Sequence, residues 1–184
     1  MRRIHTIGDS HCWFAWLKIP QVEIHFRGPM LMHSFGRDKP VVISDIPVDE
    51  PVVFCYGEID CRCHVHKYQP WRETIEKIVD SYYEALKINE DINKNIMMFN
   101  VVPPPRRSPS VSENPNFPFL GTDEERLLYV QYMNSRLAKL PYFFIDVYKH
   151  YADKDGFLRT DMSDGNVHIA DERPLQLWLE ENVL

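Results

Sequence analysis

Residues 3–10 have the sequence Arg3-Ile4-His5-Thr6-Ile7-Gly8-Asp9-Ser10, a short apolar stretch that leads into a glycine and two polar residues. The apolar stretch predicts a strand, and Gly8 predicts the sharp turn that ends it. The next seven residues, 11–17, are His-Cys-Trp-Phe-Ala-Trp-Leu and can open a helix. Ser10 is then expected at the N-terminus of that helix, where free N–H groups and the helix dipole favour a developing negative charge.

A second polar segment lies near the C-terminal end of the chain, Asp164-Gly165-Asn166-Val167-His168. A serine on a strand-to-helix turn, with an aspartate and a histidine far downstream, is one way to activate a serine nucleophile on an α/β sheet. Either segment alone is weak, because Gly-Asp-Ser also forms an ordinary turn whose side chains bond the local backbone. The position of the serine after a predicted strand favours the catalytic interpretation.

The composition is typical of one folded domain. The 184 residues are 44% hydrophobic and 26% charged, so we expect a single domain over 1–184. The net charge of -6 and a single short basic cluster, Arg106-Arg107, argue against nucleic acid as a partner. No stretch approaches the roughly 18 apolar residues of a membrane span, and the N-terminus lacks the apolar segment of a secretion signal. We therefore expect a cytoplasmic protein with no membrane partner.

Apolar runs alternate with helical patterns along the chain, which predicts an α/β fold with a parallel sheet and helices on both faces. Strands are expected at 3–7, 22–26, 52–56, 96–102 and 142–145. One helix is expected to start after Pro70. Thr122 and Glu125 have the spacing of a capping box that opens a second helix. Asp171 is expected to cap a last helix, with Pro174 in its first turn.

The segment 103–121 is rich in proline, serine and asparagine and has neither a helical nor a strand period. It follows the fourth predicted strand, and ligands of open α/β sheets bind at that end of the strands. Two interpretations are open. The segment is either a loop at the edge of an active site or a disordered surface excursion.

The cysteines are expected to be reduced thiols: Cys12, Cys55, Cys61 and Cys63. The segment 61–66, Cys-Arg-Cys-His-Val-His, contains residue types that bind zinc. The two cysteines are separated by a single residue and no second ligand pair follows, so core packing is favoured and we predict no metal site. His5 and His25 fall inside predicted strands and are expected to be satisfied core or edge residues.

Five short blocks occur in order along the chain: Gly8-Asp9-Ser10, Gly28, Gly57-Glu58-Ile59-Asp60, Pro103-Pro104-Pro105 and the late Asp-x-x-x-His. In this order of blocks the chain resembles the SGNH (GDSL-type) hydrolases over nearly its whole length. The resemblance implies a flavodoxin-like three-layer α/β/α fold with a five-stranded, mostly parallel sheet. The family consists mostly of esterases, lipases, carbohydrate deacetylases and some O-acyltransferases. No cofactor is implied.

The resemblance also implies roles for single residues. Ser10 corresponds to the nucleophile, His168 to the general base and Asp164 to the carboxylate that orients the imidazole. The backbone N–H groups of Ser10 and Gly28 correspond to part of the oxyanion hole. A serine hydroxyl is a weak nucleophile until a base takes its proton, and the imidazolium that forms needs a negative partner. Cys12 is an alternative nucleophile, because a helix N-terminus favours a thiolate.

Three further residues adjoin these blocks and are expected to contact the substrate: Asp9, His11 and Asp60. The substrate expected from the resemblance is a small molecule or a glycan that carries an ester. No expectation follows for the oligomeric state.

The late block departs from the family pattern in its spacing. The family places the aspartate three residues before the histidine, but Gly165 occupies that position here and Asp164 lies four residues before. The loop must bulge by one residue for Asp164 to reach His168. Asp161 is a second candidate for the orienting carboxylate.

The third block departs from the pattern at Ile59, where the family has an asparagine whose side chain donates to the oxyanion. Loss of such a donor costs about 100- to 1000-fold in turnover. Arg62 is our candidate replacement, because a guanidinium offers several fixed donors and a charge. In the alternative interpretation Arg62 forms a structural salt bridge with Glu58 or Asp60.

These observations predict a serine esterase that removes an acyl group, most simply acetyl, from a carbohydrate or another small polar substrate. Two alternatives remain. An O-acyltransferase that acts on glycans would use the same acyl-enzyme, and a non-catalytic binding module would keep the fold without the activity. Ile59 and the displaced Asp164 are the features that favour the module.

Overall fold

A parallel sheet forms the centre of the molecule. The computed structural model describes residues 3–107 and 114–183. Its strands are β1 (Ile4–Gly8), β2 (Val22–Phe26), β3 (Val52–Cys55), β4 (Ile96–Phe99) and β5 (Phe143–Ile145). They lie in the order β2-β1-β3-β4-β5, and every neighbouring pair is parallel. This is the order of flavodoxin-like folds, whose ligands bind where the chain switches direction across the sheet, beyond the ends of β1 and β3.

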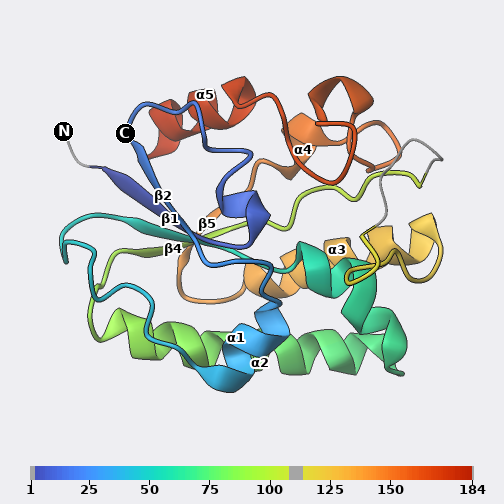
Figure 1. Cartoon of the computed structure of the whole chain (residues 1–184), viewed down its shortest axis with the longest axis horizontal. Coiled ribbons are helices and arrows are strands. Elements are labelled where there is room, and N and C mark those ends of the chain that lie inside the picture. Colours follow the sequence, from blue (N-terminus) through green and yellow to red (C-terminus); the bar gives the residue numbers. More distant parts are fainter. Residues whose placement is uncertain (1–2, 108–113, 184) are drawn as a thin grey trace.

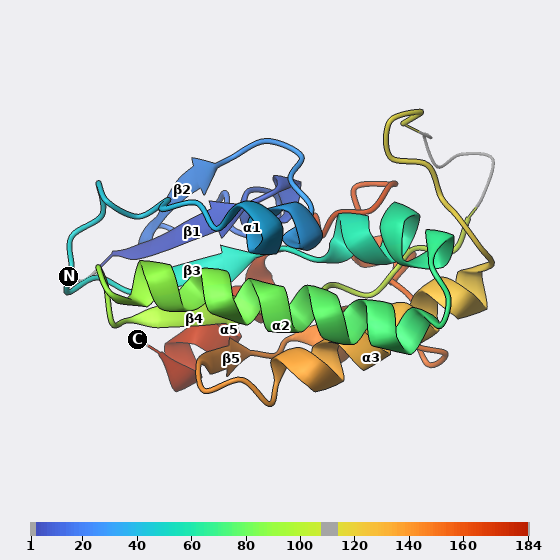
Figure 2. The same ribbon diagram turned by 90° about the horizontal axis from the view of Figure 1, so that it is seen from below.

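Helices cover both faces of the sheet, as predicted. On one face lie α1 (Met32–Asp38), α2 (Trp71–Glu90) and α3 (Asp123–Leu137), and on the other lie α4 (Tyr148–Tyr151) and α5 (Arg173–Asn182) (Figure 1). Seen from below, α2 runs along the whole of the first face (Figure 2). Each face has its own hydrophobic core. The fold is therefore a three-layer α/β/α sandwich, with α1 and α4 in addition to the helices that the sequence predicts.

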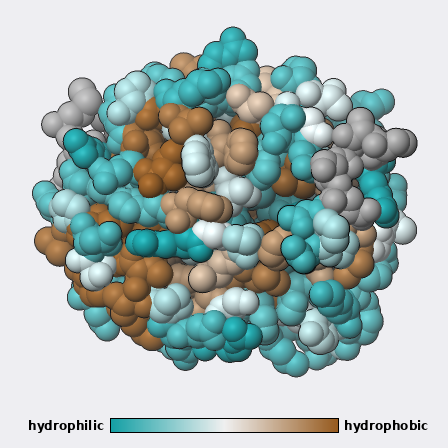
Figure 3. Space-filling view, viewed as in Figure 1, coloured by the Kyte–Doolittle hydropathy of each residue, from teal (hydrophilic) through white to brown (hydrophobic). Residues whose placement is uncertain are grey.

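The central strands are buried on both sides, which explains the continuous apolar sequence of β3, whereas β1 includes the buried polar residues His5 and Thr6. All residues of β1 and of β3 are buried. Successive side chains of a strand point to opposite faces, so Phe54 packs in the core beneath α1 and α2 while Val53 packs in the core beneath α5. The surface retains small apolar groups among hydrophilic residues, and several of them lie on the left half of the face in Figure 3.

Two of the predicted helix starts are confirmed. α2 begins at Trp71 directly after Pro70. The N-cap Thr122 of α3 accepts a hydrogen bond from the backbone N–H of Glu125 (3.1 Å), and the Glu125 carboxylate accepts one from the N–H of Thr122 (2.8 Å), which is the predicted capping box. The N-cap of the last helix differs from the predicted one by one residue.

The N-cap of α5 is Glu172 and not Asp171. The Asp171 carboxylate still accepts a hydrogen bond from the backbone N–H of Arg173, the first residue of the helix (3.1 Å). Pro174 lies in the first turn, as predicted.

The prediction of a helix over 11–17 is wrong. Only a short 3-10 turn, Ser10–Cys12, forms after β1, and turns follow it. The hydroxyl of Thr6 donates to the carbonyl oxygen of Cys12 (2.8 Å), which an α-helix would use for Trp16. Trp16 instead bonds the carbonyl oxygen of Trp13 and places its indole in the core. Burial of this indole and the side-chain bond of Thr6 thus override the local helical pattern.

Gly8 has a packing role at the end of β1. A Cβ added at this position would lie 2.0 Å from the carbonyl oxygen of Cys55 in β3. No larger residue fits there without separating the two strands, since real contacts of this kind are well beyond 3 Å. The next residue, Asp9, donates its backbone N–H to the same carbonyl oxygen (3.3 Å). The turn that carries Ser10 is therefore attached closely to β3.

The proline-rich loop after β4 is tied to other segments at both of its described parts. The carbonyl oxygen of Pro104 accepts a hydrogen bond from the N–H of Leu158 (2.9 Å), and the N–H of Leu120 donates to the carbonyl oxygen of Arg62 (3.0 Å). Residues 108–113 of the predicted loop lie outside the described residues. Within the described ranges, no helix has both the length and the apolar character needed to cross a membrane.

Candidate active site

Ser10, His168 and Asp164 form a continuous hydrogen-bonded chain. Nε2 of His168 lies 2.8 Å from Oγ of Ser10, and Nδ1 of His168 lies 2.7 Å from Oδ2 of Asp164. Ser10 belongs to the turn after β1, and the other two residues belong to the loop that precedes α5. The structure thus brings together three residues far apart in sequence, within the distances at which a serine donates to a base and the base donates to a carboxylate.

The tight turn at Gly165 allows Asp164 to reach His168 across the longer spacing. Gly165 has a φ of 87°, a left-handed conformation that glycine adopts without strain. Oδ1 of Asp164 accepts hydrogen bonds from the backbone N–H groups of Asn166 (2.9 Å) and His168 (3.2 Å), so Oδ2 is left for the imidazole. The other candidate, Asp161, instead forms an ion pair with Arg159 (2.6 Å).

The surroundings of His168 favour its neutral form. Burial lowers its pKa, and the positive charge of nearby His11 lowers it further, whereas the hydrogen bond to Asp164 and the charge of that carboxylate act in the opposite direction. Burial acts to raise the pKa of Asp164, but the hydrogen bonds from His168 and from the backbone of Asn166 outweigh it and lower that pKa. At neutral pH the arrangement therefore has a free imidazole that can accept a proton and an ionised carboxylate beside it.

Asp9 and His11 form a hydrogen-bonded pair between the turn of Ser10 and the loop of His168. Oδ1 of Asp9 accepts from the backbone N–H of His11 (2.9 Å) and from its Nδ1 (2.9 Å), and Nε2 of His11 donates to the carbonyl oxygen of Val167 (3.2 Å). Both ring nitrogens of His11 are thus donors, which describes an imidazolium. Burial opposes this charge, but the charge and the hydrogen bond of Asp9 raise the pKa of His11.

The buried pair thus connects the turn of Ser10 to the loop of His168. Asp9 is 0% and His11 is 5% exposed, so their predicted contact with the substrate is not supported by this placement.

Asp60 is also a structural residue in this arrangement. Its carboxylate accepts hydrogen bonds from the backbone N–H groups of Met32 (2.6 Å) and His33 (3.0 Å), the first two residues of α1. The side chain is completely buried, and burial raises its pKa to about 7 although these two bonds act to lower it. Asp60 therefore caps α1, and a role in binding substrate is not supported.

Two backbone N–H groups near the nucleophile are free to bind an anion. Within the described residues, the N–H groups of Ser10 and Gly28 donate to no protein acceptor. Gly28 has a φ of 84° and follows β2, the neighbour of β1. These are the two donors expected from the resemblance, and they remain available for a developing oxyanion.

Three of the five N–H donors of Arg62 bond protein groups, one from each of its side-chain nitrogens. Its Nε and Nη2 donate to the two carboxylate oxygens of Glu58 (2.8 and 3.1 Å), and Nη1 donates to the carbonyl oxygen of Phe117 (2.6 Å). This is the salt-bridge alternative, and the placement does not support Arg62 as the replacement for the family asparagine. Ile59 at the asparagine position is 3% exposed and packs in the interior.

The cysteine alternative is not supported either. Burial raises the pKa of the Cys12 thiol to about 12, and the charge of Asp9 acts in the same direction. A thiol with this pKa is protonated at neutral pH and is a poor nucleophile. All four cysteines are free and buried.

Phe14 is a residue of the site that the sequence interpretation overlooked. Its ring stacks on the imidazole of His168 although the two residues lie at opposite ends of the chain. An exposed aromatic residue four positions after the candidate nucleophile is the only local signal, and it does not indicate which side chain the ring meets.

The sequence matches no protein-family model and no curated protein. Solved structures do match. A GDSL-like lipase from Bacteroides thetaiotaomicron is 15% identical with a TM-score of 0.61, and the match covers 98% of this chain and 86% of that chain. An aryl esterase from M. smegmatis is 14% identical with a TM-score of 0.61, over 100% of this chain and 98% of that chain.

A phospholipase A1 from Streptomyces albidoflavus is 10% identical with a TM-score of 0.57, and the match covers 99% of both chains. At identities this low, the matches support a conclusion about the fold alone. The chain thus has the fold of the GDSL-type (SGNH) hydrolases, which confirms the predicted α/β architecture.

Proposed function

We propose that the protein is a serine ester hydrolase that works through an acyl-enzyme on Ser10. The observation that carries the proposal is the chain of hydrogen bonds from Ser10 through His168 to Asp164, at 2.8 and 2.7 Å. The free N–H groups of Ser10 and Gly28 support it, because an ester carbonyl that turns into an oxyanion needs donors at that place. The names of the structural neighbours, a lipase, an aryl esterase and a phospholipase, agree with this class of reaction.

In the first half of the reaction, Oγ of Ser10 bonds to the acyl carbon while its proton passes to Nε2 of His168. The negative charge that appears on the carbonyl oxygen is stabilised by the two backbone donors, and Asp164 stabilises the imidazolium. His168 then gives the proton to the leaving alcohol as the ester C–O bond breaks. In the second half, His168 takes a proton from water, whose oxygen attacks the acyl carbon, and returns it to Ser10 as the acid leaves.

For the substrate we propose a small acyl group, acetyl in the first instance, on a carbohydrate or a similar polar alcohol. A cavity of about 570 Å³ adjoins the loop that carries Asp164, and its lining includes Arg106, Asp153, Arg159, Asp161 and Asn166. These charged and amide side chains can bond the hydroxyl groups of a polar ligand. The first part of the proline-rich loop also borders this cavity, through Pro105.

The test combines a covalent probe with a set of esters. The wild-type protein is expected to hydrolyse p-nitrophenyl acetate and to be labelled on Ser10 by a fluorophosphonate. Ser10→Ala should lose both properties, and Ser135→Ala, a serine on α3 whose hydroxyl bonds the carbonyl oxygen of Tyr132, should keep them. Equal activity of Ser10→Ala, or no label on Ser10, contradicts the proposal.

The acyl preference is measured separately, with p-nitrophenyl esters of increasing chain length and with acetylated sugars. We expect kcat/KM to fall as the acyl chain lengthens, and acetate to be released from acetylated sugars. A preference for long chains would contradict the proposed substrate but not the proposed reaction. Analysis of the products with a free sugar present distinguishes hydrolysis from transfer to the sugar.

A further inference from the structure

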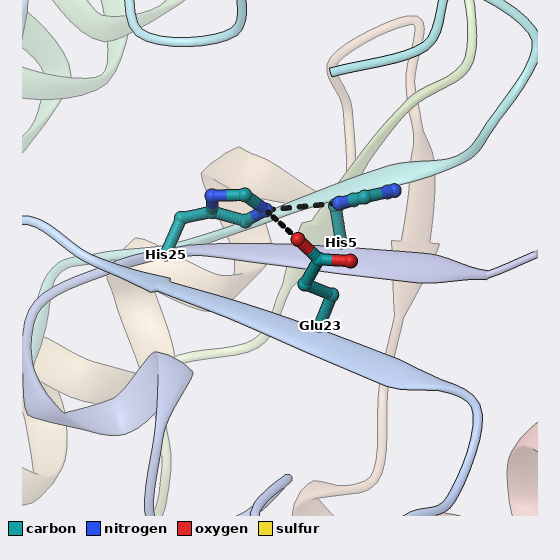
Figure 4. A group of neighbouring side chains, drawn as sticks. All are labelled: His5, Glu23 and His25. Carbon is teal, nitrogen blue, oxygen red and sulfur yellow. Dashed lines mark hydrogen bonds and ion pairs between the residues drawn. The ribbon is translucent and has the colours of Figure 1, made fainter. Parts of the chain in front are cut away.

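A cluster of side chains that can bind a metal ion lies on β1 and β2, apart from the hydrogen-bonded chain of Ser10, His168 and Asp164. His5 is in β1, and Glu23 and His25 are in β2. The strand register pairs His5 with Glu23 and places His25 two residues further along the same strand, so the three side chains share one face of the sheet. Figure 4 shows that they point toward one another.

The distances within the cluster suit a small cation. Nδ1 of His5 lies 2.9 Å from Nε2 of His25, and that same Nε2 lies 4.0 Å from Oε1 of Glu23. One ligand atom from each residue fits within 4.8 Å of the other two. Ligand atoms of a tetrahedral zinc ion lie about 3.3 Å apart, given bonds of about 2.0–2.1 Å. The side chain of Glu23 is 44% exposed, so its oxygen can move the remaining distance.

The outer contacts of the cluster orient the ligand atoms correctly. Nε2 of His5 lies 2.6 Å from Oε2 of Glu50, and a carboxylate in this position accepts the Nε2–H and leaves the lone pair on Nδ1. A carboxylate behind a ligand histidine is the usual outer contact of a metal site. In the same way, Arg3 bonds Oε2 of Glu23 (2.8 Å) and leaves Oε1 turned toward His25.

We propose that His5, His25 and Glu23 bind a divalent transition-metal ion, with Zn²⁺ as the best match to two imidazoles and one carboxylate. The metal takes the place of the proton between the two imidazoles, and His25 then carries its one ring proton on Nδ1, so both imidazoles bind the metal as neutral ligands. Water completes the tetrahedron on the side of the partly exposed Glu23 and His25. The ion joins β2, an edge strand, to β1, the strand that leads to Ser10, so its role is to stabilise the sheet rather than to take part in ester cleavage.

The experiment titrates ZnCl₂ into the full chain after dialysis against EDTA, by calorimetry. We expect one zinc ion per chain. Glu23→Gln and His25→Gln should each weaken binding by 100-fold or more, and Glu50→Gln, which removes only the outer contact, by about 10- to 100-fold. Cobalt(II) in place of zinc should give the strong visible absorption of a tetrahedral site in the wild type and lose it in both ligand variants.

His64→Gln is the matched control. The rings of His33 and His64 lie 4.5 Å apart and form another imidazole pair among the described residues, and zinc binding should survive this change. A saturating excess of zinc should raise the Tm of the wild type by about 5 °C or more, and should leave that of Glu23→Gln almost unchanged.

The proposal is overturned if the wild type binds no zinc, if Glu23→Gln and His25→Gln bind it as well as the wild type does, or if the loss occurs in His64→Gln instead. In those cases the cluster is a hydrogen-bonded chain from Glu50 through His5 to His25 and nothing more. Glu23 is exposed and forms no core contact, so its variant tests the site even if His25→Gln fails to fold.

Discussion

The ring of Phe14 lies almost parallel to the imidazole of His168, with centroids 4.0 Å apart and planes inclined by 13°. The two nitrogens of the imidazole point along the ring plane toward Ser10 and Asp164. A flat surface against one face of the imidazole hinders its rotation out of that plane. Phe14 is therefore expected to position the base without contacting the reacting atoms.

Phe14→Ala should lower kcat for p-nitrophenyl acetate by about 10- to 100-fold with a smaller change in KM, because a displaced base is costly even when the substrate still binds. Phe14→Tyr keeps the stacked ring and should restore most of kcat. Leu17→Ala removes another exposed apolar side chain of the same turn (58% exposed) and is the control. An equal loss in Leu17→Ala, or an effect on KM alone, would refute the positioning role.

Asp164→Asn should lower kcat by about 10⁴-fold, because an amide in that place stabilises the wrong tautomer of the imidazole and cannot offset its charge. Asp161→Asn is the matched variant of the other candidate carboxylate, and it should change kcat by less than about twofold. Measurement of kcat for both variants shows which aspartate orients His168. A larger loss in Asp161→Asn would reverse the assignment.

The acid limb of the pH profile of kcat/KM should lie below pH 6.5, the ordinary pKa of histidine, because burial and the charge of His11 lower the pKa of His168. Protonation of His168 removes the base, so activity is lost as the pH falls through that pKa. His11→Gln removes the positive charge, which raises the pKa of His168 and should move the limb to higher pH. His150→Gln, an exposed histidine, should leave the limb in place, and a limb that moves to lower pH in His11→Gln would contradict this account.

Arg62→Met should reduce the free energy of unfolding by about 3–5 kcal/mol, because it leaves the charge of Glu58 buried without its partner. The side chains of Arg62 and Glu58 are 10% and 6% exposed. The double variant with Glu58→Met should recover much of the loss. Lys87→Met breaks an exposed pair with Glu84 and should cost less than about 1 kcal/mol.

Urea unfolding measures these differences. In conditions where Arg62→Met is folded, kcat should stay within a few-fold of wild type. A loss of about 100- to 1000-fold would instead assign the missing oxyanion donor to Arg62.

The strands were predictable from sequence for a simple physical reason. β3 is buried on both faces and its sequence is an uninterrupted apolar run, and β1, also buried, keeps isoleucines on either side of His5 and Thr6. α1 was not predictable, because its first N–H groups are capped by Asp60, which lies 28 and 27 residues further along the chain from the two donors. The helix expected over 11–17 fails for a related reason, since the bond from Thr6 to Cys12 is invisible to a local pattern.

The candidate site was predictable in its residues but not in its assembly. The ordered blocks identify Ser10 and His168, yet only the left-handed turn at Gly165 explains how Asp164 reaches the imidazole. The structure therefore removes one of the two features that favoured a non-catalytic module. Ile59 remains as the other feature, because its buried aliphatic side chain donates no hydrogen bond. The stack of Phe14 on His168 joins distant segments, which no local pattern reveals.

The close approach of Gly8 to the carbonyl oxygen of Cys55 shows that the glycine and the serine of the Gly-Asp-Ser motif are required for different reasons. The glycine is required by the contact between β1 and β3 whether or not the protein hydrolyses anything. The serine hydroxyl is required only if the protein does. A homologue that keeps Gly8 and replaces Ser10 is therefore expected to keep the contact between β1 and β3 and to lack ester hydrolysis.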